Sequence, residues 1–166
     1  MKTGREALKH MKTEFIRQYN RSWLVYAKVV KAFDVDAWLS TGRKGYTSGR
    51  LAFHMLQSIK FYLGDKEALV YGQGKPFDAD PWKMAEEDVP TQEQILGLME
   101  VMKAKTEQWL AGLDYSATNT AFPWAGETML GVVIFTLDHH LWHLGELSGL
   151  LNESKHGEIG DLYIVD

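Results

Sequence analysis

Apolar residues recur at three- and four-residue spacing along four long stretches of the chain, which is the pattern of helices that bury one face. The stretches cover residues 5–33, 47–63, 91–112 and 126–151. In the first of them the apolar positions are Leu8, Met11, Phe15, Tyr19, Trp23 and Tyr26. No segment shows the alternating pattern of a half-buried strand. Four helices with one face each to bury favour an all-α fold, a four-helix bundle.

Local signals at the ends of the stretches support these helices. Thr91 and Gln94 have the spacing of a capping box, in which each side chain binds the backbone N–H of the other residue. Gly64 fits a C-terminal cap, and a short turn is expected at residues 37–39. The second and third helices are joined by a long loop, residues 65–90, with little helical pattern. Because such loops are often functional, we expect residues 71–82 to form a lid.

The fourth stretch is apolar on two opposite faces. Leu130, Val133 and Leu137 lie on one face, and Val132 and Phe135 on the other. A helix that is apolar on most sides is usually buried, so this pattern predicts the central helix of the bundle. The tail, residues 152–166, is polar until residues 162–165, which we expect to pack in an extended form against the bundle.

Length, charge and composition exclude several classes of function. A chain of 166 residues suits a single domain, residues 1–166. The net charge of −4 provides no basic field for nucleic acid or anionic lipid. The chain has no cysteine, which excludes disulfides, thiolate metal sites and a cysteine nucleophile. The N-terminus lacks the apolar core of a signal peptide, and the most apolar run, residues 129–135, is too short to span a bilayer. We therefore expect a cytoplasmic protein that binds neither nucleic acid nor membrane.

Histidines in the second and fourth helices are the candidates for chemistry. His139 and His143 are four residues apart, so their side chains lie on one helical face a turn apart and can reach one metal ion. His54 offers a third imidazole from the second helix. Three neutral imidazoles suit Zn²⁺, Ni²⁺, Fe²⁺ or Cu²⁺. Three protein ligands also leave a coordination position open for water or substrate, as in catalytic zinc sites.

Simpler interpretations stay open for each of these residues. Histidine pairs also occur in ordinary cores, and His54 lies off the main apolar stripe of its helix, so it either meets protein on a second face or is exposed. His140 points to a different face and is expected to play a supporting or structural role. Glu146 lies on the side of His139 and His143, where it could orient a ligand, act as an acid or base, or be a solvated charge. His140 stands where the His-Glu-x-x-His motif needs glutamate, which excludes that metalloprotease pattern.

The histidine pattern resembles the DinB/YfiT-like metalloenzyme family. Its members are four-helix bundles with one histidine in the second helix, matched here by His54, and a fourth-helix signature that commonly reads His-x-x-x-His-Arg-Gly-Gln-(Leu/Ile). The matching stretch here is His139-x-x-x-His143-Leu144-Gly145-Glu146-Leu147. Leu144 and Glu146 replace the common arginine and glutamine, while the three metal-ligand positions are intact.

This resemblance implies a bound divalent cation, foremost zinc or nickel, with iron as a further candidate. It also implies a homodimer and a small-molecule substrate. Some members transfer or isomerise substrates with a low-molecular-weight thiol such as bacillithiol or mycothiol, and others look like hydrolases. The leading hypothesis is therefore a metal-dependent thiol S-transferase or hydrolase. The alternative is a non-catalytic, metal-stabilised bundle that serves binding or interaction.

Overall fold

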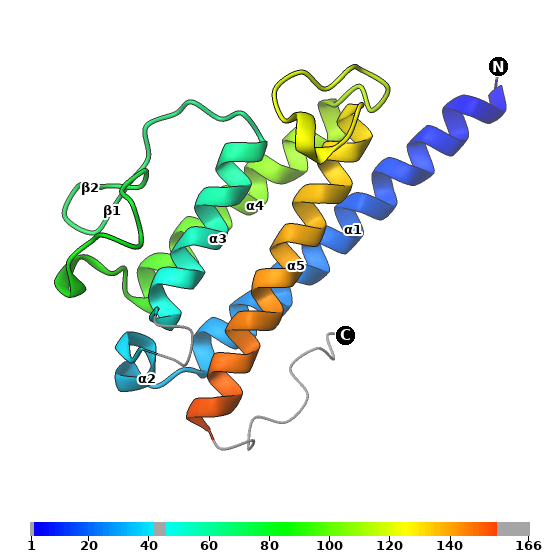
Figure 1. Ribbon diagram of the computed structural model, residues 1–166. Coiled ribbons are helices and arrows are strands. Elements are labelled where there is room, and N and C mark those ends of the chain that lie inside the picture. The colour runs from blue at the N-terminus through cyan, green and yellow to red at the C-terminus, as the bar shows by residue number, and fades with distance from the viewer. Residues whose placement is uncertain (1, 42–45, 156–166) are drawn as a thin grey trace.

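The structure is a computed structural model that describes residues 2–41 and 46–155. Its helices, given in chain order, are α1 (Lys2–Ala32), α2 (Val35–Leu39), α3 (Ser48–Tyr62), α4 (Gln92–Gly112) and α5 (Met129–Ser154). The described part of the chain is mostly helical, which confirms the all-α prediction (Figure 1). The long helices lie close to the predicted bounds, and α2 takes the place of the expected short turn. The tail segment at residues 162–165 lies outside the described residues.

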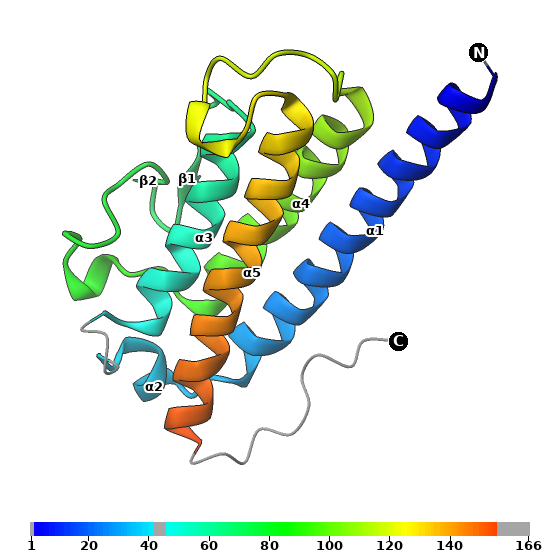
Figure 2. The same ribbon diagram turned by 45° about the vertical axis from the view of Figure 1, so that its right-hand side comes forward.

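The four long helices pack side by side. α1 contacts α4 and α5, and α3 contacts the same two helices from the other side (Figures 1 and 2). The N-terminal part of α1 extends beyond the other helices, and Leu8, on the predicted apolar face, is therefore 42% exposed. None of the described helices combines the length and apolar character needed to cross a bilayer.

Tyrosines of α1 fix the helices that carry the candidate histidines. Tyr19 and Tyr26 are buried, as the periodicity of the first stretch predicts. The hydroxyl of Tyr19 donates to the backbone carbonyl of Val133 on α5 at 3.0 Å. The hydroxyl of Tyr26 donates to the carbonyl of Ala52 on α3 at 2.9 Å. Since buried hydroxyls need partners, each bond favours one register of α1 against its neighbour.

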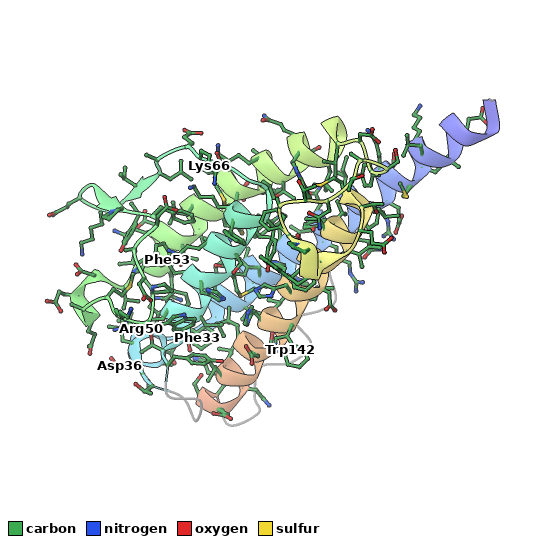
Figure 3. All side chains as sticks on the ribbon, turned by 45° about the horizontal axis from the view of Figure 1, so that its top comes forward. Phe33, Asp36, Arg50, Phe53, Lys66 and Trp142 are labelled. Atoms are coloured by element: carbon green, nitrogen blue, oxygen red, sulfur yellow. The ribbon has the colours of Figure 1, made fainter. Side chains whose placement is uncertain are left out.

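Helix α5 is buried on fewer sides than its sequence suggests. It packs against α3 and α1, but Ile134, Leu141 and Trp142 are exposed, and Trp142 is 68% exposed on the outer side of the helix (Figure 3). The prediction of a central, buried helix is therefore wrong. The reason is that α3 and α1 cover only part of its circumference: Val132 is buried and Phe135 packs against Tyr62 of α3, whereas the side with Ile134, Leu141 and Trp142 has no helix beside it among the described residues.

The N-terminus of α4 confirms the predicted capping box. The side chain of Thr91 accepts from the backbone N–H of Gln94, and the side chain of Gln94 accepts from the backbone N–H of Thr91. This reciprocal pairing satisfies two backbone donors that the first helical turn leaves without partners. The helix therefore begins directly after the long loop.

The long loop between α3 and α4 contains a short antiparallel ladder. Strand β1 (Val70–Tyr71) pairs with β2 (Lys75–Pro76), so that Val70 lies opposite Pro76 and Tyr71 opposite Lys75. Gly72 at φ 53° and Gly74 at φ 82° close the turn between them. These left-handed angles favour glycine, because other residues are strained there. A further short helical turn, η1 (Glu86–Asp88), precedes α4.

This loop is anchored to α3. Phe77 is fully buried, and its ring packs edge-on against Phe53 at a centroid distance of 5.2 Å. The amide Nε2 of Gln57 donates to the carbonyls of Phe77 and Ala79 at 2.6 and 2.7 Å. A lid that opens by moving its backbone would have to break these contacts. The loop expected to be a lid is therefore held in place, and it contributes to the site as a wall.

His140 lies in the core between α5 and α1. It is 1% exposed, and its ring lies 4.6 Å from that of Trp23 and 5.9 Å from that of Tyr26. Among the described residues neither of its ring nitrogens has a hydrogen-bond partner. Burial lowers the pKa of His140 to about 3, so the side chain is neutral at pH 7. The structural role predicted for His140 fits this packing, but its nitrogens are desolvated without compensation.

We expect the substitution His140→Leu to raise the free energy of unfolding of the metal-free protein at pH 7 by about 1–3 kcal/mol, because it removes two unpaired polar atoms at similar volume. Urea denaturation measures this change. The matched control is Thr136→Val on the same helix, since the Thr136 hydroxyl is also buried but donates to the Val132 carbonyl at 2.7 Å. The control should give no gain. A loss of stability in His140→Leu would contradict the prediction.

Candidate metal centre

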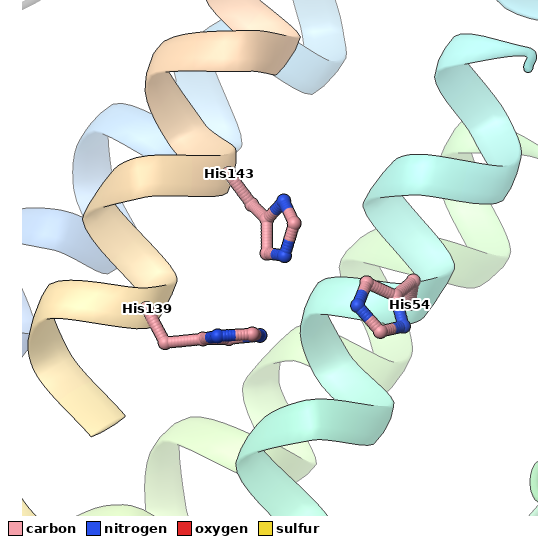
Figure 4. Close-up of side chains that lie close together, drawn as sticks. All are labelled: His54, His139 and His143. Atoms are coloured by element: carbon pink, nitrogen blue, oxygen red, sulfur yellow. The ribbon is translucent and has the colours of Figure 1, made fainter. Parts of the chain in front are cut away.

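Three histidines from two helices converge on one point in space. His54 projects from α3, and His139 and His143 project from α5 (Figure 4). One ring nitrogen of each lies within 4.8 Å of those of the other two. The ring centroids are 4.6 Å apart for His139 and His143, 5.0 Å for His54 and His143, and 6.1 Å for His54 and His139. Nitrogens this close can bind a single cation with small side-chain adjustments.

The backbone explains why the three side chains meet. His139 and His143 share a face of α5 because four residues make about one turn. α3 packs against α5, and the side of α3 that carries His54 turns out to face that helix. His54 is half-buried there. The sequence left open whether this second face of α3 meets protein, and the structure shows that it does.

Glu146 is hydrogen-bonded to one of the three histidines, His143. Its Oε2 lies 2.7 Å from Nδ1 of His143, and the hydroxyl of Tyr46 donates to the same oxygen at 3.4 Å. The side chain of Glu146 is 15% exposed, so the interpretation as a solvated charge is wrong. Because a carboxylate accepts a hydrogen bond, it favours the His143 tautomer that carries its proton on Nδ1. The other nitrogen, Nε2, is then free to bind a cation.

The other two imidazoles are also suited to cation binding. Nε2 of His139 is buried without a hydrogen-bond partner among the described residues. Nε2 of His54 lies 3.4 Å from the hydroxyl of Ser58, one turn further along α3. Burial, followed by repulsion from His143 and His139, lowers the pKa of His54 to about 4. Burial and repulsion by His143 also lower the pKa of His139. Both rings are therefore neutral at pH 7, with a lone pair available for a metal.

Aromatic rings surround the histidines on two sides. The ring of Trp82, from the anchored loop, lies 5.1 Å from that of His54, and Tyr46 lies 5.3 Å beyond it. On the other side Phe135 stacks on His139 at 6.0 Å, and Tyr62 lies 5.9 Å from the same ring. Sequence reasoning assigned no role here to Tyr46 or Tyr62. Tyr46 lies between α2 and α3 and carries no periodic signal, whereas Tyr62 belongs to the apolar pattern of α3.

One cavity opens directly onto two of the three histidines. It has a volume of about 280 Å³ and is lined by His54, Gln57, Ser58, Phe61, Tyr62 and His139. A larger cavity, of about 770 Å³, lies at the C-terminal end of α3 and shares Gln57, Phe61 and Tyr62 with it. A third cavity, of about 490 Å³, includes Tyr46, Arg50, Trp82 and Glu86 in its lining, and Trp82 lies between it and His54. A small molecule in the first cavity can therefore contact His54 and His139.

No protein-family model, curated protein or solved structure matches the chain in sequence or fold comparisons. Within the described residues, the geometry of the three histidines is what points to chemistry, because ligand-type nitrogens gather in a half-buried space beside an open cavity.

The lowered pKa of His54 predicts that the folded, metal-free protein loses stability as the pH falls. The folded state gives up this proton at about pH 4, whereas the unfolded chain does so at about pH 6.5. The folded state thus binds fewer protons between these values, so stability is full above pH 6.5 and falls as the pH drops towards 4. We expect His54→Gln to flatten the decline of the melting temperature over this window. The control His10→Gln, an exposed position on α1, should keep the wild-type slope. Equal slopes in all three proteins would contradict the prediction.

Proposed function

We propose that this chain is a four-helix bundle of the DinB/YfiT-like type that binds a divalent cation through His54, His139 and His143 and acts on a small molecule. The observation that carries the proposal is the convergence of one nitrogen from each histidine within 4.8 Å. The packing of four long helices supports it, as does the long loop between the second and third of them. The buried, unpaired Nε2 of His139 supports it further, since a cation would satisfy that atom.

The donor set fits the cations that the family resemblance implies. Three neutral imidazoles suit Zn²⁺ or Ni²⁺, and Fe²⁺ as a further candidate, and three protein ligands leave a coordination position open. A divalent cation held there would lower the pKa of a water molecule or thiol that it binds, which provides a nucleophile near neutral pH. This property serves both proposed reaction classes, transfer of a low-molecular-weight thiol and hydrolysis of a small substrate.

The remaining residues of the site position and shield the histidines. Glu146 accepts a hydrogen bond from Nδ1 of His143 and so directs the opposite nitrogen towards the other two imidazoles. Because Tyr46 and His143 both engage this carboxylate, we assign Glu146 a positioning role in place of proton transfer to substrate. Trp82 packs against the ring of His54, and Phe135 packs against the ring of His139.

The proposed homodimer has a candidate surface. Helix α5 exposes the apolar residues Ile134, Leu141 and Trp142, and Trp142 lies on its outer side (Figure 3). Gly145 and Gly149 carry no neighbouring atoms within 4 Å of an added Cβ, so a second chain could approach the helix backbone there. Exposed apolar patches of this kind favour protein association.

Metal analysis tests the proposal directly. We expect purified wild-type protein to hold about one divalent cation per chain. The variant His139→Ala, His143→Ala should hold less than about a tenth of that, because a single imidazole cannot retain the ion. The control His10→Ala, on the exposed part of α1, should match the wild type. Equal metal content in the double variant and the wild type would end the proposal.

Activity and stability measurements on the metal-loaded protein distinguish an enzyme from the non-catalytic alternative. Turnover of an electrophile with a low-molecular-weight thiol, or of a small ester with water, that disappears on chelation supports an enzyme. A melting temperature that falls on chelation, with no turnover of either kind, supports a bundle in which the metal serves stability.

The role of Glu146 gives a second measurable outcome. We expect Glu146→Ala to weaken zinc affinity by about 10- to 100-fold, because His143 loses the acceptor that fixes its tautomer. Glu146→Gln should retain most of the affinity, since its amide oxygen can still accept from Nδ1. A competition titration with a chromogenic chelator measures both. The control Glu107→Gln removes an exposed carboxylate on α4 and should change nothing. Unchanged affinity in Glu146→Ala would refute the positioning role.

A further inference from the structure

Arg50 lies one helical turn before His54 on the same face of α3. Four residues rise about 6 Å along a helix, so the two side chains are neighbours. Figure 3 shows Arg50 towards the end of α3 that faces α2. Arg50 is half-buried and lines the cavity of about 490 Å³ together with Tyr46 and Trp82. Since Trp82 also packs on the His54 ring, this cavity and the histidine group share a wall.

Arg50 forms no ion pair within the described residues. Its guanidinium makes one hydrogen bond, from Nη1 to the carbonyl of Pro81 at 2.7 Å. Glu86 lines the same cavity but forms no ion pair with it, and no other described carboxylate lies within 4.0 Å of it. By contrast, the buried Lys60 is paired with Asp78 at 3.2 Å. A half-buried guanidinium with several unused donors is suited to bind an anionic group.

The aromatic lining indicates what that anionic group is attached to. Trp82 is 46% exposed, and its ring lies 5.3 Å from that of Tyr46 at an angle of 54°. Such rings bind apolar or planar carbon skeletons, while the guanidinium fork matches the two oxygens of a carboxylate. A ligand with a carboxylate on a small planar or apolar body would therefore satisfy both parts of the lining.

We propose that the cavity formed by Tyr46, Arg50 and Trp82 binds the carboxylate of a small organic acid, which is the substrate of the site at His54, His139 and His143. The claim that this acid is the substrate rests on the proposed function. The claim that the cavity binds a carboxylate does not. Arg50 fixes one end of the molecule in the cavity. The rest of the molecule lies against the partly exposed Trp82 ring, which packs on His54.

Calorimetric titration with benzoate tests the proposal, with benzamide as the neutral analogue. Arg50→Gln keeps an amide donor for the Pro81 carbonyl but loses the positive charge. We expect it to weaken benzoate binding by about tenfold or more in both metal-free and zinc-loaded protein, and to leave the weaker benzamide binding unchanged. Arg50→Lys should retain part of the benzoate affinity, since the charge persists without the fork.

Two controls separate charge from structure. Arg17→Gln removes an exposed guanidinium on α1 and should bind benzoate like the wild type. Gln57→Ala loosens the same loop through its bonds to the Phe77 and Ala79 carbonyls, yet keeps Arg50. Because Trp82 belongs to that loop, the quantity compared is the ratio of benzoate affinity to benzamide affinity, which Gln57→Ala should keep. If that ratio falls as far as in Arg50→Gln, the effect belongs to the loop and the proposal is overturned.

The remaining outcomes are also decisive. Benzoate binding that requires zinc and is indifferent to Arg50→Gln would place the anion on the cation and overturn the proposal. Absence of benzoate binding to the wild type would overturn it as well. Metal content, measured on the same samples, reports separately on the proposed function. Arg50-dependent benzoate binding in a protein that holds no metal would sustain the anion site while the metal hypothesis fails.

Discussion

The packing of α3 against α5 determines where His54 lies relative to the two histidines of α5. His139 and His143 are placed together by helix geometry alone, whatever the rest of the chain does. The third nitrogen depends on the register between two helices that are far apart in sequence. A rotation of α3 by one residue position, about 100°, would turn His54 away from α5. The tyrosine bonds of α1, to Val133 on α5 and to Ala52 on α3, help to hold that register.

The histidine group is an accumulation of polar atoms between helices that otherwise pack through apolar side chains. Burial and repulsion from neighbouring histidines lower the pKa of His54 and of His139, and Glu146 is the one carboxylate hydrogen-bonded to the group among the described residues. Such an arrangement costs stability unless something binds it. His140 shows the same cost in the core, where its ring packs against Trp23 and Tyr26 but its two nitrogens have no hydrogen-bond partner among the described residues.

Much of the helical structure follows from periodicity, and the site follows from it only in part. The capping box at Thr91 and the pairing of His139 with His143 are local, so spacing alone predicts them. The face of His54 could not be decided, because a one-helix pattern does not say which neighbour covers a second face. Trp82 and Tyr46 come from irregular segments, where no period exists to place a side chain. The prediction that α5 is a central, buried helix was wrong for a similar reason. The apolar character of a helix indicates a preference for burial, but it does not say how many helices lie beside it.

The anchored loop has a consequence for the rate at which molecules enter and leave. Its backbone is fixed by the buried Phe77, by Gln57, and by the Asp80 carboxylate, which accepts from the backbone N–H of Trp82 at 2.9 Å. Access to His54 from the cavity at Tyr46 and Arg50 is then governed by rotamer changes of the partly exposed Trp82 ring. Such changes take picoseconds to nanoseconds, whereas lids that move their backbone often need microseconds to milliseconds. Ligand exchange here would therefore be a fast equilibrium that precedes any slower chemistry.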